Sequence, residues 1–303
     1  MIWRILKWIT ALALLGVVLF SGVVYWYFYS NHAPKTDMFP LNIASLRDAA
    51  NDQAGEKPSH IEVEIISHTP APRIAMVGGT NWSEIDLIRA AYRIVSPEAS
   101  IILDTGYSES VARETGATDY SSAAWTRTRQ HIAAADMVLI THAHIDHSGG
   151  LDASAGNAWL SRLQIETLEA QGHSVPRGAQ MIEFGTDGLF SPAPGIVIVQ
   201  ASGHTPGSQL VYVQLSDETE ILFMGDTASM LDNVRLQRPR SRFVMERLTQ
   251  ADRGAVFAQT KALKALSEAA PDLMLVPGHD SAAIEALIEK GVLKARFASS
   301  PAP

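Results

Sequence analysis

The chain has 303 residues, of which 47% are apolar, and a formal net charge of -8. This length is enough for one large domain or two smaller ones, and the acidic balance argues against a nucleic-acid partner, which usually requires a basic face. The absence of cysteine excludes a disulfide, a cysteine zinc site and a thiol nucleophile.

The N-terminal segment predicts a membrane anchor over residues 1–30. Residues 8–29 carry no charged side chain and include the apolar run 11–20. About 20 apolar residues cross a bilayer, so we expect contact with the lipid bilayer through residues 8–29. Aromatic residues flank the span like the interfacial belts of membrane proteins: Trp3 and Trp8 at one end, and Trp26, Tyr27 and Tyr29 at the other.

Basic residues indicate the orientation of this span. Arg4 and Lys7 precede it, and only Lys35 follows closely. This bias favours a cytoplasmic N-terminus and a globular domain in the periplasm, as in a single-pass protein of the cell membrane. A cleaved signal peptide is the alternative, but it would have a shorter apolar core and a cleavage site of small residues.

Residues 31–59 form a polar connector that we interpret as a linker or stalk. Proline and glycine punctuate it, and only residues 43–50 have helical periodicity. The globular pattern begins near residue 60, because Ile61–Ile65 alternates as a half-buried strand does.

Short apolar runs and helical patterns then follow one another through the domain expected over residues 60–303. The expected strands are Ile61–Ile65, Arg73–Val77, Ser100–Leu103, Met137–Ile140, Ile196–Val199, Leu210–Leu215, Ile221–Met224 and Leu273–Val276. The expected helices are Ser122–Ala135, Ala158–Gln171, Ala255–Ala270 and Ser281–Lys290. Strands in two clusters with helices between them predict an α+β domain in which helices cover two packed sheets.

The stretch from His142 to His147 predicts a metal site. His142, His144, Asp146 and His147 follow directly after the apolar run Met137–Ile140. Neutral imidazole and carboxylate groups are ligands that zinc and its neighbours prefer. A strand that ends in a tight loop can aim such side chains at one point, which also favours chemistry on a metal-bound water.

Three further positions complete this pattern. His204, Asp226 and His279 each follow an expected strand and are flanked by glycine or proline. Glycine lets the backbone turn sharply and approach an ion. Any one of these residues alone would be read as an ordinary loop or turn residue, so the prediction depends on their occurring together.

The motifs Leu103-Asp104-Thr105-Gly106, His142-x-His144-x-Asp146-His147, His204, Asp226 and His279, in this order, resemble the metallo-β-lactamase superfamily. The resemblance runs from about residue 61 to 290. It implies a four-layer αββα sandwich with metal ions at one edge.

The resemblance also implies a role for each motif residue. His142, His144 and His204 would hold a first metal ion, while Asp146, His147 and His279 would hold a second. Asp226 would bridge the two ions, and Asp104 would support the ligand loop without binding metal. Two zinc ions are implied, with manganese or iron as alternatives, and a hydroxide that bridges them would attack the substrate. Asp226 and Asp146 are thus the expected catalytic residues, Asp146 also as a proton shuttle.

Local strings favour the branch of the superfamily that contains lactonases and glyoxalase II. Classical β-lactamases of this fold lack the bridging aspartate, and flavodiiron proteins have glutamate where His144 stands. Gly203–Gln209 and Pro277–Asp280 resemble the lactonase-like branch. We therefore expect a membrane-anchored dinuclear zinc hydrolase that cleaves an ester, lactone or thioester bond in a small molecule. Acyl-homoserine lactonases, however, typically carry a tyrosine where this chain has Ser229.

Other functions stay open. Arginines between Asp226 and His279 could bind the phosphate of a phosphodiester or face anionic lipid headgroups; they are Arg235, Arg238, Arg240, Arg242 and Arg247. A persulfide dioxygenase with one iron ion and a non-catalytic metal-binding protein are alternatives of another class.

Three aromatic residues have two interpretations. They could border a substrate pocket or pack in the core: Tyr107, Tyr120 and Trp125.

Overall fold

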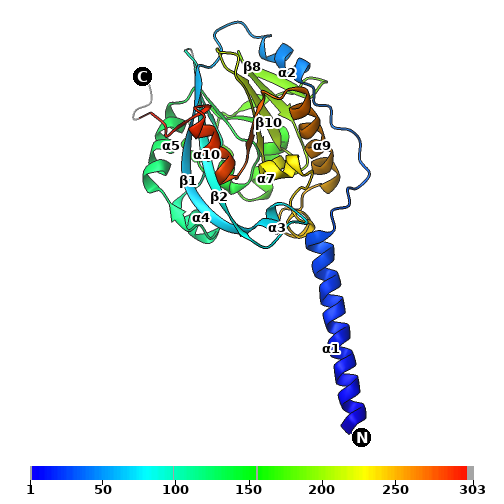
Figure 1. Ribbon diagram of the computed structural model, residues 1–303. Coiled ribbons are helices and arrows are strands. Elements are labelled where there is room, and N and C mark those ends of the chain that lie inside the picture. Colours follow the sequence, from blue (N-terminus) through cyan, green and yellow to red (C-terminus); the bar gives the residue numbers. More distant parts are fainter. Residues whose placement is uncertain (1, 98, 155, 299–303) are drawn as a thin grey trace.

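The computed structural model describes residues 2–97, 99–154 and 156–298. Two β-sheets face each other, and helices cover both outer faces, as Figure 1 shows. The predicted α+β class and four-layer αββα sandwich are confirmed.

The first sheet has the strand order β13-β1-β2-β3-β5, with the short β4 paired to β1. The antiparallel pair β1 and β2 forms its centre, and β13 and β5 pair in parallel at its edges. Its strands are β1 (His60–Pro72), β2 (Glu84–Val95), β3 (Ser100–Leu103), β4 (Asp119–Tyr120), β5 (Met137–Leu139) and β13 (Leu293–Ala295).

The second sheet has the strand order β12-β11-β10-β9-β8. Here β12 is parallel to β11, and the other neighbours are antiparallel. Its strands are β8 (Leu189–Ala193), β9 (Ile196–Gln200), β10 (Gln209–Gln214), β11 (Glu220–Gly225) and β12 (Met274–Pro277). A separate parallel pair consists of β6 (Trp159–Ser161) and β7 (Gln180–Ile182).

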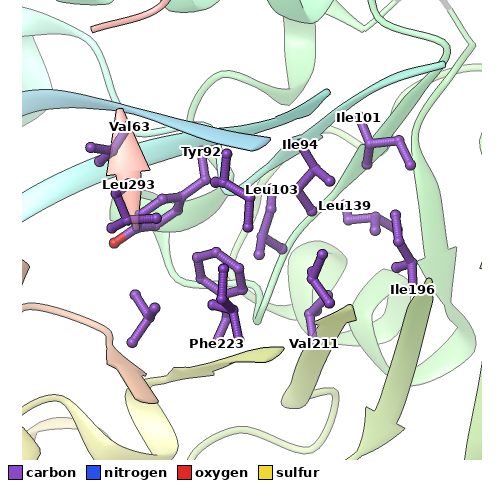
Figure 2. Close-up of a cluster of buried hydrophobic side chains, with 14 of the residues drawn as sticks. Val63, Tyr92, Ile94, Ile101, Leu103, Leu139, Ile196, Val211, Phe223 and Leu293 are labelled. Atoms are coloured by element: carbon purple, nitrogen blue, oxygen red, sulfur yellow. The ribbon is translucent and has the colours of Figure 1, made fainter. Parts of the chain in front are cut away.

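The main core lies between the two sheets. In β11, Ile221 and Phe223 point into this layer, whereas Leu222 belongs to the cluster on the opposite face. Figure 2 shows Phe223 and Val211 from the second sheet against Tyr92 and Leu103 from the first. Burial on both faces explains why these strands are continuous apolar runs rather than alternating ones.

Helices pack on the outer faces. α5 covers the first sheet through Ala124 and Ile132, and α9 covers the second through Leu263 and Leu266. The helices on the globular part are α2 (Ile43–Ala50), α3 (Arg73–Met76), α4 (Glu109–Glu114), α5 (Ser122–Ala134), α6 (Ile145–Ser148), η2 (Leu151–Ala153), α7 (Arg162–Ala170), η3 (Asp226–Ala228), α8 (Leu231–Arg235), η4 (Val244–Leu248), α9 (Arg253–Ala269) and α10 (Ser281–Glu289).

Three sequence-based assignments need correction. Arg73–Val77 is not a strand, because β1 ends at Pro72 and one helical turn, α3, follows; a short apolar run does not distinguish strand from helix. The helix expected over Ala158–Gln171 is shorter, since β6 occupies its start and Ser161 caps α7. The long strand β2 was not predicted at all.

The N-terminal helix projects from the globular part (Figure 1). α1 (Ile2–Val24) continues into the π-helical turn η1 (Tyr25–Tyr29), and together they form an apolar helix of 28 residues that is long enough to cross a membrane. The connector expected as a stalk over residues 31–59 does not extend away from the domain. Its helix α2 buries Leu46 and Ala50 against the outer face of the second sheet.

Candidate metal centre

Five loops meet at one edge of the sandwich and carry the predicted site residues. They follow β3, β5, β9, β11 and β12, whose ends lie at the same edge because β3 and β5 are parallel and β9, β11 and β12 run in one direction. The loops supply Asp104, then the stretch from His142 to His147, then His204, Asp226 and His279.

The first group consists of His142, His144, His204 and Asp226, whose ligand atoms lie within 4.8 Å of one another. Nδ1 of His144 is 3.0 Å from Nε2 of His142 and 3.0 Å from Nε2 of His204. Oδ2 of Asp226 is 3.3 Å from Nε2 of His204. Four potential ligand atoms therefore face one point.

The second group consists of Asp146, His147 and His279. The Nε2 atoms of His147 and His279 are 3.3 Å apart, and Oδ2 of Asp146 lies 3.6 Å from Nε2 of His279. The two groups adjoin each other, since the ring centroids of His142 and His147 are 4.1 Å apart.

Asp226 connects the two groups. Its Oδ2 faces His204, and its Oδ1 lies 2.9 Å from Nε2 of His279. Gly278 makes room for this carboxylate, because a Cβ atom at that position would lie 2.8 Å from Oδ1 of Asp226. One carboxylate is therefore placed to give one oxygen to each of two ions.

Neighbouring groups fix the orientation of the imidazoles. Nδ1 of His279 donates to the carbonyl oxygen of Ile88 at 2.9 Å, which leaves its Nε2 lone pair directed at the site. Nδ1 of His147 lies 2.8 Å from Oδ2 of Asp104. Asp104 also accepts the backbone N–H of Thr141 at 2.7 Å. Asp104 thus contacts both the start of the loop at Thr141 and the imidazole of His147.

Burial keeps most of the histidines neutral. It lowers the pKa of His142, His144 and His279, and lowers the pKa of His204 to about 3. A neutral imidazole is the form that binds a metal ion.

Charged neighbours decide the remaining protonation states. Burial alone would raise the pKa of Asp226, but Arg240 and the adjacent histidines outweigh it and hold that pKa well below its ordinary range. For His147, burial is outweighed by Asp104 and Asp146, which raise its pKa to about 9. A metal ion bound at His147 would therefore displace a proton.

This arrangement fits two divalent metal ions of the zinc type. Ligand atoms about 2.1 Å from a tetrahedral zinc ion are about 3.4 Å apart, close to the separations of 3.0 and 3.3 Å in the two groups. A neutral imidazole has one N–H and one lone pair, so nitrogens that converge on one point cannot all be satisfied by one another. A cation accepts all of these lone pairs.

Two arginines at the site were not assigned there from the sequence. Arg89 of β2 places Nε 2.6 Å from Oδ2 of Asp146, and Arg240 places a terminal nitrogen 2.5 Å from Oδ2 of Asp226. Arg89 was missed together with its strand. Arg240 was one of five arginines considered as a group, and the sequence contained no signal that separates it from the others.

The other four arginines are elsewhere. Arg242 lies over the ring of Trp26 at 4.0 Å, and Arg247 bonds the hydroxyl of Tyr27. Arg238 donates to the carbonyl oxygen of Gly78, and Arg235 is exposed at the end of α8.

The aromatic residues that were considered for a substrate pocket are buried or partly buried in the protein interior. Tyr107 is fully buried and bonds Ser67 at 2.6 Å, so it does not line a pocket. Tyr120 and Trp125 pack against the cluster under α5. The buried hydroxyl of Ser229 donates to Oδ1 of Asp226 at 3.1 Å, and this bond helps to orient that carboxylate.

Two sheets covered by helices, with two adjoining groups of histidine and aspartate at one edge, define an αββα protein with a two-metal type of site. The family model described as the metallo-beta-lactamase superfamily matches residues 86–279, and the chain belongs to this superfamily. No curated protein sequence matched the chain.

Several solved structures share the fold. A quorum-quenching N-acyl homoserine lactone lactonase has a TM-score of 0.63 at 18% identity, over 77% of this chain and 97% of that one. An N-acyl homoserine lactone hydrolase with its product at the catalytic metal centre has a TM-score of 0.62 at 18% identity, over 76% and 96%. The dizinc quorum-quenching lactonase AidC has a TM-score of 0.50 at 14% identity, over 77% and 92%. Together with the family, these likenesses support a metal-dependent hydrolase.

Proposed function

We propose that this chain is a membrane-anchored, dinuclear zinc hydrolase that cleaves an ester, lactone or thioester bond in a small molecule. The observation that carries the proposal is the position of Asp226, whose two oxygens face two different groups of histidines. A site for one iron ion would not need the second group, so the geometry favours hydrolysis over the persulfide dioxygenase alternative.

The proposal gives each residue a task. One ion would be held by His142, His144 and His204, and the other by His147, His279 and Asp146. Asp226 would bind both ions. Two such ions lower the pKa of a shared water and polarise the oxygen of the bond under attack. Asp146 is the more exposed of the two ligand carboxylates, at 17% against 4% for Asp226, so we assign proton transfer to its free oxygen.

Anchoring by an uncleaved helix is supported by contacts at the base of α1. The ring of Phe28 lies 4.9 Å from Trp82 and 5.5 Å from Phe243, and its carbonyl oxygen accepts the N–H of Gly79 at 2.7 Å. Cleavage after this point would remove side chains on which the domain packs. An intact mass of the membrane-bound protein tests this: the anchor predicts the full chain, and a mass without the apolar segment would refute it.

The hydrolase proposal is tested with the full chain in detergent. Metal analysis should give about two zinc ions per chain, whereas one iron ion would support the dioxygenase. His204→Ala and Asp226→Ala should each lower turnover at least about a hundredfold while the fold is retained. His173→Ala, in the loop after α7, is the matched control. Full activity of both site variants would contradict the assignment as a metal-dependent hydrolase.

A second candidate, phosphodiester hydrolysis, is favoured by one observation. The guanidinium of Arg240 reaches the site, and arginine binds phosphate through charge-assisted hydrogen bonds. Lactone, thioester, aryl-ester and phosphodiester substrates compared side by side would rank the two functions by kcat/KM.

A further inference from the structure

Arg240 is a largely buried cation at the candidate metal centre. Its side chain is only 9% exposed, and a terminal nitrogen lies 2.5 Å from Oδ2 of Asp226. Within residues 2–97, 99–154 and 156–298, no hydrogen-bond acceptor meets its buried Nε. A buried guanidinium whose donors are only partly used is placed to bind a further acceptor.

The backbone holds Arg240 in this position. The carbonyl oxygen of Pro239 accepts the N–H of Gly78, and the N–H of Ser241 donates to the carbonyl oxygen of Ala75, both at 2.9 Å. The residues on either side of Arg240 are thereby fixed to α3 and to the residues directly after it. The fold therefore fixes the backbone at Arg240, and the ion pair with Asp226 directs the guanidinium into the site.

Metal ions would compete with Arg240 for Asp226. The same Oδ2 that Arg240 contacts faces His142 and His204, at 3.6 and 3.3 Å. An ion in this group would draw on the lone pairs of that oxygen, and the guanidinium would lose part of its partner. The guanidinium could then pair with a negatively charged oxygen of another molecule in place of Oδ2 of Asp226.

The net charge of the candidate metal centre also favours binding of an anion. Asp104, Asp146 and Asp226 supply three negative charges, and Arg89 and Arg240 cancel two of them. Two divalent ions would add four positive charges to the one net negative charge that remains. A buried surplus of this kind favours an anion, because charges interact strongly where water is excluded.

We propose that Arg240 binds a negatively charged oxygen of the substrate beside the metal ions and so selects anionic substrates. The inference rests on the proposed hydrolase function and narrows its substrate class. The oxygen belongs to a carboxylate carried by the ester or to a phosphodiester, and both chemistries suit the guanidinium fork.

The test compares Arg240→Gln and Arg240→Lys with the parent, as full-length holoenzymes in detergent. Arg235→Gln, which removes an exposed arginine of α8, is the matched control. Binding of inorganic phosphate is measured by calorimetry, and the metal content of each variant is determined. Turnover is measured with neutral para-nitrophenyl acetate, with the carboxylate ester mono-para-nitrophenyl glutarate, and with bis-para-nitrophenyl phosphate.

We expect Arg240→Gln to keep its metal ions and to bind phosphate at least about tenfold more weakly. Its kcat/KM should fall by a similar factor for an anionic substrate, mainly through KM, but not for the acetate ester. Arg240→Lys should recover part of the loss, and Arg235→Gln should match the parent. The anionic substrate that shows the selective loss identifies the carboxylate or the phosphodiester as the source of the oxygen.

Other results would overturn the inference. Arg240→Gln could lose equal activity on neutral and anionic substrates, could bind phosphate as tightly as the parent, or could lose its metal ions. The parent could also fail to bind phosphate. Each would show that Arg240 serves Asp226 and not the substrate. Failure of the parent to cleave any substrate would instead refute the proposed function. The calorimetric measurement would still test whether Arg240 binds an anion.

Discussion

Asp104 shows how one residue behind the metal centre organises the ligand loop. It has a left-handed backbone, with φ at 58°, which aspartate tolerates better than most residues. From there its carboxylate reaches both Thr141 and Nδ1 of His147. The same carboxylate stabilises the proton on Nδ1 of His147, which would make its Nε2 a better ligand for a metal ion.

We predict that Asp104→Asn weakens binding of the second metal ion by about 10–100-fold. The amide keeps the shape of the side chain but loses the charge that orients His147. Competition with a chelator measures the affinity. Asp86→Asn is the control, because it breaks a similar pair with His68 on the surface, with a separation of 2.6 Å. Equal metal affinity in Asp104→Asn and Asp86→Asn would contradict the role of Asp104.

Gly278 is predicted to be required for the bridging carboxylate. Its replacement by alanine would place a methyl group 2.7 Å from the carbonyl oxygen of Gly225 and 2.8 Å from Oδ1 of Asp226. Since backbone cannot move easily, Asp226 must shift, and we expect fewer than two metal ions per chain with little change in secondary structure. Metal analysis and circular dichroism check this. Gly254→Ala, in the first turn of α9, should keep both ions, and full metal content in Gly278→Ala would refute the argument.

The residues of the two candidate metal groups could be found from the sequence, whereas the arginines beside them could not. Each of these histidines and aspartates stands in a short motif at the end of a strand, so its position follows from local spacing. Arg89 and Arg240 reach the site from β2 and from the loop after α8, and nothing near them in the chain states which partner they meet. Their role depends on tertiary packing alone.

At the level of elements, burial decides which strands can be recognised. β9, β10 and β11 are buried on both faces and appear in the sequence as apolar runs. β2 pairs with β1 along its whole length, yet Asp86, Arg89 and Arg93 interrupt its apolar pattern. Arg93 is buried and paired with Glu62, so this strand carries charges that only the folded structure accounts for.

α5 provides a prediction for the pH dependence of stability. His131 of this helix is buried, contacts Phe297 with ring centroids 5.3 Å apart, and lies 3.0 Å from the carbonyl oxygen of Ala298. Burial lowers the pKa of His131 from the ordinary value of 6.5. The unfolded chain therefore binds this proton more readily, and the free energy of unfolding falls as the pH drops below about 6.5.

We expect His131→Gln to lose part of this dependence. Urea unfolding at pH 7.5 and 5.5 should show a smaller decrease in the free energy of unfolding for the variant than for the parent. The other histidines are common to both proteins, so their contributions cancel in the comparison. An identical decrease in the two proteins would show that His131 is protonated as easily in the folded state as in the unfolded chain.

At the level of the whole molecule, one loop joins the metal centre to the base of the apolar helix. Arg240 lies at the centre, while Arg242 stacks on Trp26 and Phe243 on Phe28. Figure 1 shows that α1 leaves the body beside α3, the segment to which this loop is bonded. The edge of the sandwich that carries the candidate metal site is thus on the same side of the domain as the apolar helix.

The contacts of Phe28 make the junction testable. Phe28 packs between Trp82 and Phe243, whereas Phe20, two turns earlier in the same helix, is 70% exposed. Phe28→Ala should therefore lower the free energy of unfolding of the domain in detergent by about 1–3 kcal/mol, and Phe20→Ala should leave it unchanged. Urea unfolding followed by circular dichroism measures this difference. Equal stability of the two variants would mean that the helix is only tethered to the domain, and the metal edge would then have no fixed orientation relative to the helix.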